Sequence, residues 1–142
     1  MMGNASYKPD RLAGGLLVAT GIVTLGVAFY LMVIRPPMLP EDLRFTGLDP
    51  HALSSPMADW LRIVFRTWGG FVAGFAILII SLGAYLWTSN VRALRWGVAF
   101  GVLVAFGRFL ASNIALRSDF LPAIVIIAAL AVIAALLLVL RR

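Results

Sequence analysis

The sequence predicts an all-α integral membrane protein, a four-helix bundle, and two observations carry that prediction. Of its 142 residues, 62% are hydrophobic and only 13% are charged, whereas soluble domains are about half apolar and a quarter charged. The apolar residues are also gathered into four long runs separated by shorter polar segments. Too few polar side chains remain to cover a globule in water, so lipid is the solvent that suits this composition.

The first predicted span covers residues 12–34 and contains no charged side chain. At about 1.5 Å per residue, it is long enough to cross roughly 30 Å of hydrocarbon. It exceeds the apolar core of a signal peptide, and no small-residue cleavage site follows, so we expect a retained helix. Arg35-Pro36-Pro37 ends it, because proline lacks an amide donor and disfavours helix in the residue before it.

Three further spans are predicted at residues 60–87, 93–116 and 120–140. Ser55-Pro56 predicts that the second helix begins ahead of its membrane-crossing part, since serine is a good N-cap and proline suits the first turn. The later connections are a few residues long, so neighbouring helices are expected to run antiparallel. The whole chain, residues 1–142, is interpreted as one transmembrane domain.

A longer loop, predicted to lie outside the cell membrane, joins the first two spans over residues 35–55. Within it, Pro40-Glu41-Asp42 predicts a short helical turn, and Asp49-Pro50 predicts a cap for a second one. Four apolar side chains of this loop are expected to fold back onto the mouth of the bundle: Leu39, Leu43, Phe45 and Leu48.

Basic residues near the span ends predict the orientation of the chain. On one side the flanking charges are nearly all positive: Lys8, Arg11, Arg92, Arg95, Arg141 and Arg142. On the other side basic and acidic residues are mixed: Arg35, Arg44, Arg62 and Arg117 with Glu41, Asp42, Asp49, Asp59 and Asp119. The positive-inside rule therefore places both termini in the cytoplasm, with the protein in the inner (plasma) membrane of a bacterium. The same scatter of charge argues against nucleic acid as a partner, despite the net charge of +6.

Arg108 interrupts the third span with a permanent charge. Counting 100° per residue places Gly97 and Gly101 within about 20° of its direction and Ser112 within about 40°. The opposite face carries Phe106 and other bulky side chains. We therefore expect Arg108 to point into the packed interior, where a charge costs less than against lipid but still requires a partner.

Small residues are expected to allow close approach of the helices, because lipid gives no hydrophobic reward for their association. Gly70-x-x-x-Gly74 lies in the second helix and Gly97-x-x-x-Gly101 in the third, while the first helix carries several glycines of its own. These contacts are expected either within the chain or between two copies of it.

An outward-facing polar pocket follows from these placements. Arg66 and Arg108 fall at comparable depths of about 9 and 13 Å from the outer side, counted at 1.5 Å per residue. The side chains proposed to bind a ligand there are Arg62, Arg66, Arg108, Ser112 and Asn113. The carboxylates proposed as charge partners are Glu41, Asp42, Asp59 and Asp119. Two interpretations remain open. Either these charges pair with one another and fix the register of the helices, or the arginines bind an anion through their paired donors.

The sequence lacks the residue patterns of common catalytic sites. It contains no cysteine, a single histidine at His51, no Walker loop and no zinc-protease motif. We therefore expect no metal and no cofactor, and favour a protein that is not an enzyme.

Two short motifs, Arg66-x-x-Gly69-Gly70 and Phe106-Gly107-Arg108-Phe109, carry a resemblance. The chain resembles small bacterial integral membrane proteins of four helices, whose families are named only as domains of unknown function. The resemblance implies the architecture and no activity.

Two functions remain open on the sequence alone. The first is a non-enzymatic structural or accessory bundle, as a homo-oligomer or a subunit of a larger membrane complex. The second is a binder or carrier of an amphipathic anion, such as a lipid headgroup, a fatty acid or a small acidic metabolite. Membrane lipid is a partner in either case.

Overall fold

The computed structural model describes residues 10–49, 53–89 and 91–140. Every regular element in these ranges is helical: α1 (Arg11–Phe29), the π-helical turn η1 (Tyr30–Ile34), α2 (Pro40–Thr46), α3 (Ser55–Thr88), α4 (Arg92–Ala115) and α5 (Leu121–Leu140). The all-helical prediction is thereby confirmed, as is the short turn at Pro40. His51, the Asp49-Pro50 cap and the terminal basic residues Lys8, Arg141 and Arg142 involve positions outside the described residues.

Four helices are long and apolar enough to cross a membrane: Arg11–Ile34, Ser55–Thr88, Arg92–Ala115 and Leu121–Leu140. Three of them match the predicted spans to within one residue at each end. Ser55-Pro56 also marks the start of α3, but the prediction that Ser55 is the N-cap is wrong. The N-cap is Ser54, and its side chain makes no capping hydrogen bond. These lengths and compositions indicate a multi-pass membrane protein.

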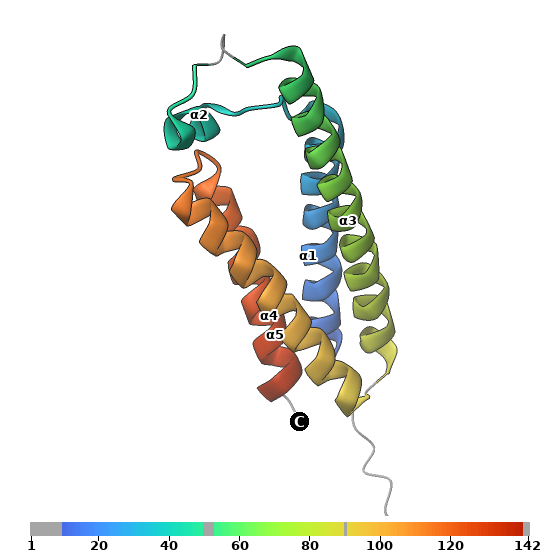
Figure 1. Cartoon of the computed structure of the whole chain (residues 1–142). Coiled ribbons are helices and arrows are strands. Elements are labelled where there is room, and N and C mark those ends of the chain that lie inside the picture. The colour runs from blue at the N-terminus through green and yellow to red at the C-terminus, as the bar shows by residue number, and fades with distance from the viewer. Residues whose placement is uncertain (1–9, 50–52, 90, 141–142) are drawn as a thin grey trace, which may run out of the picture.

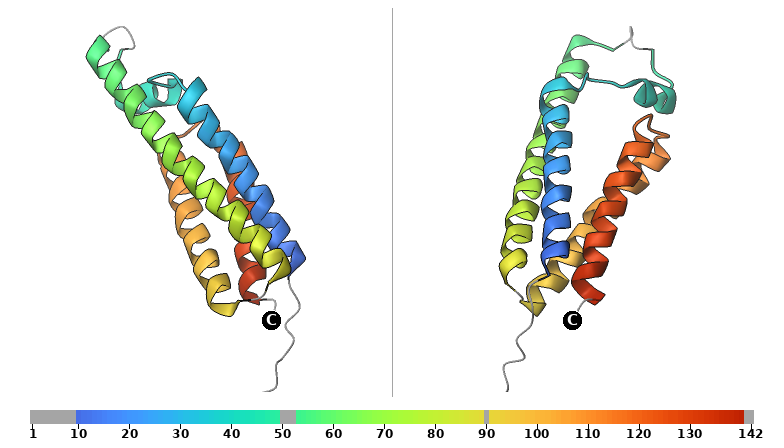
Figure 2. Two further views of the ribbon diagram at one scale, coloured as in Figure 1. Left: turned by 90° about the vertical axis from the view of Figure 1, so that its right-hand side faces the viewer. Right: turned by 180° about the vertical axis from the view of Figure 1, so that it is seen from behind.

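The long helices pack as two pairs (Figure 1). α1 lies along α3 and α4 lies along α5, and the pairs meet mainly where α1 contacts α5. α3 and α4 follow one another in the chain yet barely touch. Figure 2 shows that the pairs are close at the end where α5 finishes and diverge toward α2 at the other end. The architecture is therefore a bundle that is closed at one end and open at the other.

The hydrophobic core occupies the closed end. Its buried side chains come from all four long helices: Ala13, Leu17, Ile79, Leu86, Val98, Ala99, Val102, Phe106, Ile127, Ala131, Ala134, Ala135 and Leu138. None of these residues belongs to the last turns of α1, the first turns of α3 or the end of α4. The open end is left without a comparable core, which is why a cavity can form there.

Glycines bring α1 and α3 together. A Cβ atom on Gly14 would lie 2.7 Å from the carbonyl oxygen of Gly83, and one on Gly21 would lie 3.0 Å from the carbonyl oxygen of Ala76. The distance at Gly14 is shorter than real Cβ contacts, so that position requires glycine. The distance at Gly21 is tight, and the new Cβ would also lie 2.5 Å from Cγ1 of Ile80, so a larger residue there would force α1 and α3 to adjust. Gly69 is similarly close to η1, where Met32 lies against it. Small residues therefore do set a helix contact, as expected for membrane helices.

The four glycines singled out in the sequence do not make that contact. A Cβ added at Gly70, Gly74, Gly97 or Gly101 would meet nothing within 4 Å. The expectation that they pack helices within the chain is wrong. Contact between two copies of the chain remains a prediction.

The predicted orientation of α4 is also wrong. Its buried face carries Arg95, Val98, Ala99, Val102 and Phe106, and Phe106 is only 5% exposed. Arg108 is exposed instead of interior. The physical reason lies in α5, whose buried alanines supply the small surface: Ala128, Ala131, Ala134 and Ala135. Because the face of α5 that contacts α4 is rich in alanine, the larger side chains of α4, including Phe106, pack against it. Gly97 and Gly101 of α4 then lie on the opposite, open side.

Backbone hydrogen bonds end α4 in a sharp turn. The Arg117 amide donates to the Ile114 carbonyl, and the Ser118 amide donates to the Asn113 carbonyl, both at 3.0 Å. This pattern is a Schellman motif, which needs a left-handed residue at its corner. Arg117 occupies that corner with φ of 51°. The turn places Ser118 directly beneath α2.

A crevice roofed by the helix α2

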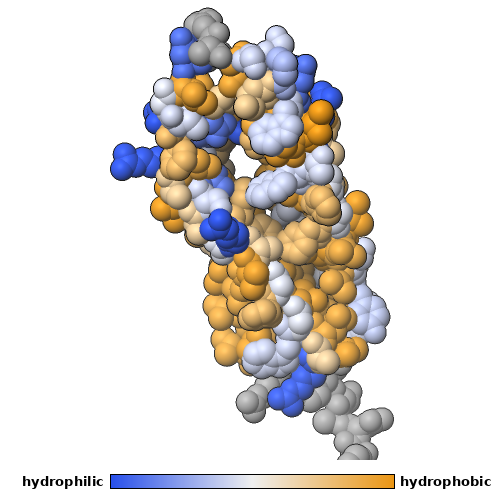
Figure 3. Space-filling view, viewed as in Figure 1, coloured by the Kyte–Doolittle hydropathy of each residue, from blue (hydrophilic) through white to orange (hydrophobic). Residues whose placement is uncertain are grey.

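A crevice separates the two helix pairs at their open end. It consists of a cavity of about 620 Å³ beneath α2 and an adjoining one of about 240 Å³ closer to the core. Five apolar side chains line both parts: Val27, Leu31, Trp68, Phe109 and Ile127. Figure 3 shows the hollow between the two halves of the molecule at this level. Its walls are apolar, and its polar groups are concentrated at the roof.

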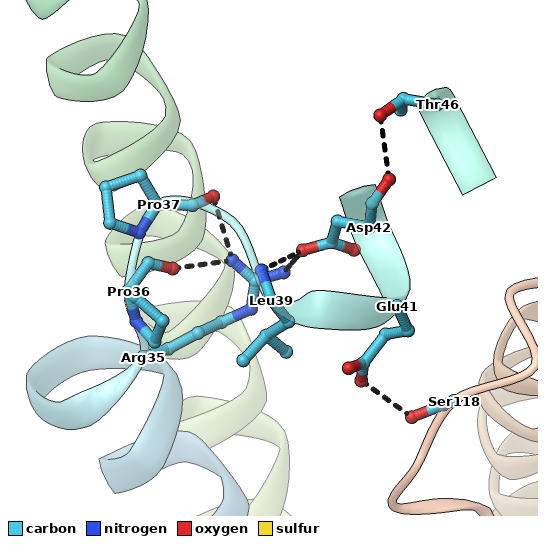
Figure 4. Close-up of polar contacts among 8 residues, drawn as sticks. All are labelled: Arg35, Pro36, Pro37, Leu39, Glu41, Asp42, Thr46 and Ser118. Carbon is cyan, nitrogen blue, oxygen red and sulfur yellow. Dashed lines mark hydrogen bonds and ion pairs between the residues drawn. The ribbon is translucent and has the colours of Figure 1, made fainter. Parts of the chain in front are cut away.

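Arg35 fixes one end of the roof to the first helix pair (Figure 4). Its Nη2 donates to Asp42 Oδ2 at 2.5 Å, and its Nη1 donates to the carbonyl oxygen of Pro36 at 3.0 Å. The guanidinium also lies 3.3 Å from the centre of the Phe65 ring of α3. Only 6% of the side chain is exposed. The sequence indicated Arg35 as a helix-ending residue and gave no sign of this role.

Asp42 also caps the N-terminus of α2. Its Oδ2 accepts a hydrogen bond of 2.8 Å from the Leu39 amide. A carboxylate at this position of the first turn stabilises a helix start. The ion pair with Arg35 therefore holds α2 at its N-terminus, and Gly47 ends the helix with a left-handed φ of 68°.

Glu41 joins the roof to the second helix pair. Its Oε1 accepts a hydrogen bond of 3.0 Å from the Ser118 hydroxyl, and Glu41 is only 3% exposed. Its Oε2 is buried and has no hydrogen-bond partner in the described part of the chain. Figure 4 shows this second oxygen turned away from Ser118, and Glu41 is one of the residues that line the larger cavity.

A surface ion pair also links α2 to the turn between α4 and α5. Arg44 Nη2 donates to Asp119 Oδ1 at 2.7 Å, and both side chains are more than half exposed. The hydrogen bond from Arg44 to Asp119 raises the pKa of the guanidinium, so the arginine remains charged. α2 is thus bound to both helix pairs and spans the crevice as a roof.

Two loop side chains that were expected to fold onto the bundle do not. Phe45 is 65% exposed and Leu48 is 50% exposed, whereas Leu39 and Leu43 are partly covered. Leu39 lines the larger cavity. The prediction holds for the half of the segment that faces the crevice.

The structure gives the proposed charge partners other tasks. Asp59 binds Arg62 at 2.5 Å across one helical turn, on the exposed surface of α3. The remaining three carboxylates bind elsewhere: Asp42 to Arg35, Asp119 to Arg44 and Glu41 to Ser118. Among the described residues, none accepts a hydrogen bond from the guanidinium of Arg66 or Arg108, and none forms an ion pair with it.

The five proposed ligand residues are divided between two places. Arg62 and Arg66 line a separate cavity of about 260 Å³ beside Arg35 and Phe65. Arg108 and Ser112 border the inner part of the crevice, and Asn113 lines its outer part.

Ser112 and Asn113 turn back onto their own helix. Ser112 Oγ donates to the Arg108 carbonyl at 3.0 Å, and Asn113 Nδ2 donates to the Phe109 carbonyl at 2.9 Å. Each polar group is therefore satisfied by α4 while it borders the apolar crevice.

Arg95 is a structural residue that the sequence did not reveal. It is buried, and its Nε donates to the Leu138 carbonyl at 2.8 Å while its Nη2 donates to the Leu137 carbonyl at 3.3 Å. A cation at the C-terminus of a helix satisfies free carbonyls and opposes the helix dipole. Its position in the sequence could have indicated this role. Arg95 lies nearly one turn inside α4, whereas a basic residue that only sets membrane orientation normally lies outside the apolar span.

The motifs that carry the resemblance occupy unlike environments. Gly69 packs against η1, whereas Gly70 and Gly107 are open, and Arg108 borders the crevice. The membership suggested by the resemblance stays a prediction. No protein-family model matches the sequence, and comparison with curated proteins and with solved structures gives no match either.

Proposed function

We propose that this chain is a multi-pass inner-membrane protein that binds an amphipathic anion in the crevice beneath α2. In this proposal the four long helices cross the bilayer in alternating directions, and both termini are cytoplasmic. The open end of the bundle, with α2, then faces outward. The protein acts as a binder or carrier and not as an enzyme.

The observation that carries the proposal is the guanidinium of Arg108, which borders an apolar crevice and has no partner among the residues that the structure describes. A charge within the thickness of a bilayer is costly unless an opposite charge or polar group meets it. The carboxylates near the crevice bind other groups within the protein. An anion from outside the chain is therefore the missing partner.

The shape and chemistry of the crevice favour a lipid-like anion. Its walls of Val27, Leu31, Phe109 and Ile127 suit an acyl chain. The long arginine side chain buries its methylene groups along an apolar wall and extends its charged end toward the headgroup level. There its planar donors match a phosphate or carboxylate.

Native mass spectrometry of the full chain in mild detergent tests this function. We expect phospholipid adducts on the wild type and a loss of at least five-fold in adduct intensity for Arg108→Gln. Arg92→Gln is the matched control, because Arg92 is an exposed arginine at the opposite end of the same helix. Equal adducts on all three proteins would refute lipid binding through Arg108.

An accessory role in a larger assembly is the second candidate. The observation that favours it is the open space at Gly70 and Gly74 on α3 and at Gly97 and Gly101 on α4. Such pairs permit close contact with another helix. Chemical crosslinking in native membranes would reveal the assembly, and Gly101→Leu would abolish the crosslink if that surface is used.

A further inference from the structure

The second carboxylate oxygen of Glu41 is the unexplained polar atom of the crevice. It is buried without a hydrogen-bond partner on a residue that is 3% exposed and lines the larger cavity. Buried polar atoms are nearly always satisfied, and a buried carboxylate needs donors on both oxygens. A donor from a bound molecule is therefore missing at this place.

Among the described carboxylates of α2 and the turn that follows α4, Glu41 is the one without an ion pair. Arg35 is bound to Asp42 and Arg44 to Asp119, whereas Glu41 receives only the neutral hydroxyl of Ser118. Two arginines thus face three carboxylates, and the carboxylate left over is the one inside the crevice. A cation is the complement of this site.

The charges are arranged in order along the crevice. Glu41 is at the roof, next to the turn that follows α4. Arg108 lies seven residues before Ala115, the last residue of α4, which is roughly 10 Å deeper at 1.5 Å per residue. The crevice therefore presents a negative group outermost and a positive group nearer the acyl region.

We infer that the crevice selects a zwitterionic lipid with a primary ammonium headgroup, with Glu41 binding the ammonium and Arg108 the phosphate. This inference rests on the proposed function. In such a lipid the ammonium lies beyond the phosphate as seen from the acyl chains, which matches the order of Glu41 and Arg108. The aromatic pair Tyr30–Phe120, with ring centres 5.7 Å apart, lines the same cavity and suits a cation.

The requirement for a donor separates two common headgroups. A primary ammonium carries three N–H donors, one of which satisfies Glu41 Oε2. A quaternary ammonium has the same charge and no donor. The inference therefore predicts that preference falls as the nitrogen is methylated and disappears at the quaternary stage.

The test is a competition between lipids with identical acyl chains. Equal amounts of phosphatidylethanolamine, its N,N-dimethyl form and phosphatidylcholine are added to the full chain in detergent, and bound lipids are measured by native mass spectrometry. We expect at least a five-fold excess of phosphatidylethanolamine over phosphatidylcholine, with the dimethyl form between them. Glu41→Gln should remove the excess, because it keeps an acceptor for Ser118 but loses the charge.

Two further variants separate the possible failures. Asp119→Asn changes a carboxylate of the turn between α4 and α5 that binds α2 but does not line the cavity, and it should keep the preference. Arg108→Gln should weaken all three lipids and leave their ratio unchanged. Equal binding of the three lipids that still depends on Arg108 would overturn the inference and leave the proposed function standing. An equal loss of all lipids in Glu41→Gln would give Glu41 a structural role only, and no binding to the wild type would defeat the proposed function itself.

Discussion

Arg35, which directly follows η1, and Phe65 of α3 form a stacked contact in which the guanidinium carbon lies 3.3 Å from the ring centre. The same guanidinium binds Asp42 of α2. One side chain therefore connects α2 to α3 across the outer end of the first pair. Several consequences of this and related contacts can be measured.

Replacing Arg35 by lysine should loosen the roof although the charge is kept. Lysine cannot lie flat on Phe65 while donating in several directions, so the stacking and part of the hydrogen bonding are lost. We expect the free energy of unfolding to fall by about 1–2 kcal/mol. Thermal unfolding of the full chain in detergent measures this change. Arg92→Lys, at an exposed site, should have no effect, and equal stability of the two variants would contradict the contact.

Adding one methyl group at Gly14 should separate α1 from α3. The new Cβ would lie 2.7 Å from a carbonyl oxygen of Gly83, and backbone atoms cannot move aside cheaply. We expect Gly14→Ala to lower the stability by about 1–3 kcal/mol. Gly97→Ala is the control, because that position is open, and alanine favours a helix over glycine. A stabilising Gly14→Ala would show that α1 and α3 are not packed in this way.

Replacing Arg117 by glycine should stabilise the turn between α4 and α5. The residue has a φ of 51°, a left-handed conformation that costs L-amino acids about 1–2 kcal/mol. We expect a gain of about 1 kcal/mol, reduced by the greater freedom of glycine in the unfolded chain. Arg117→Ala, which keeps the strain, is the comparison. A melting temperature for glycine below that of alanine would argue against the Schellman turn.

Removing the charge of Arg95 should fray the end of α5. Arg95→Met keeps an apolar stem of similar length but leaves the carbonyls of Leu137 and Leu138 without their donors. We expect a loss of about 2–3 kcal/mol. Hydrogen exchange should become faster in the last turn of α5 and stay unchanged in its first turn. Uniform exchange along the helix would show that Arg95 does not act as a cap.

The spans could be predicted because long apolar runs are a local property of the sequence. Proline in the first turn likewise predicted where α3 and the short helix at Pro40 begin, although no side-chain hydrogen bond caps α3. The face of α4 could not be predicted, since it depends on what α5 offers as a partner. Alanines on α5 made Phe106 the inward residue and left Gly97 outside.

For the site, the sequence could predict which types of residue are present but not which of them pair with one another. The sequence indicated an excess of arginines with carboxylates near them, but pairing depends on contacts between distant segments. Arg44 and Asp119 are 75 residues apart, and Glu41 and Ser118 are 77 apart. Asp59 and Arg62 are one turn apart in a single helix, and their pairing is of the kind that sequence reasoning can find.

The scarcity of contacts between α3 and α4 decides how a molecule reaches the crevice. α2 covers the crevice at the open end of the bundle and the core fills the closed end, while the two helix pairs diverge between them (Figure 2). The side of the crevice between α3 and α4 is therefore the least covered by helix contacts. If the proposed function holds, we expect a ligand dissolved in the bilayer to reach the crevice through this side without crossing bulk water.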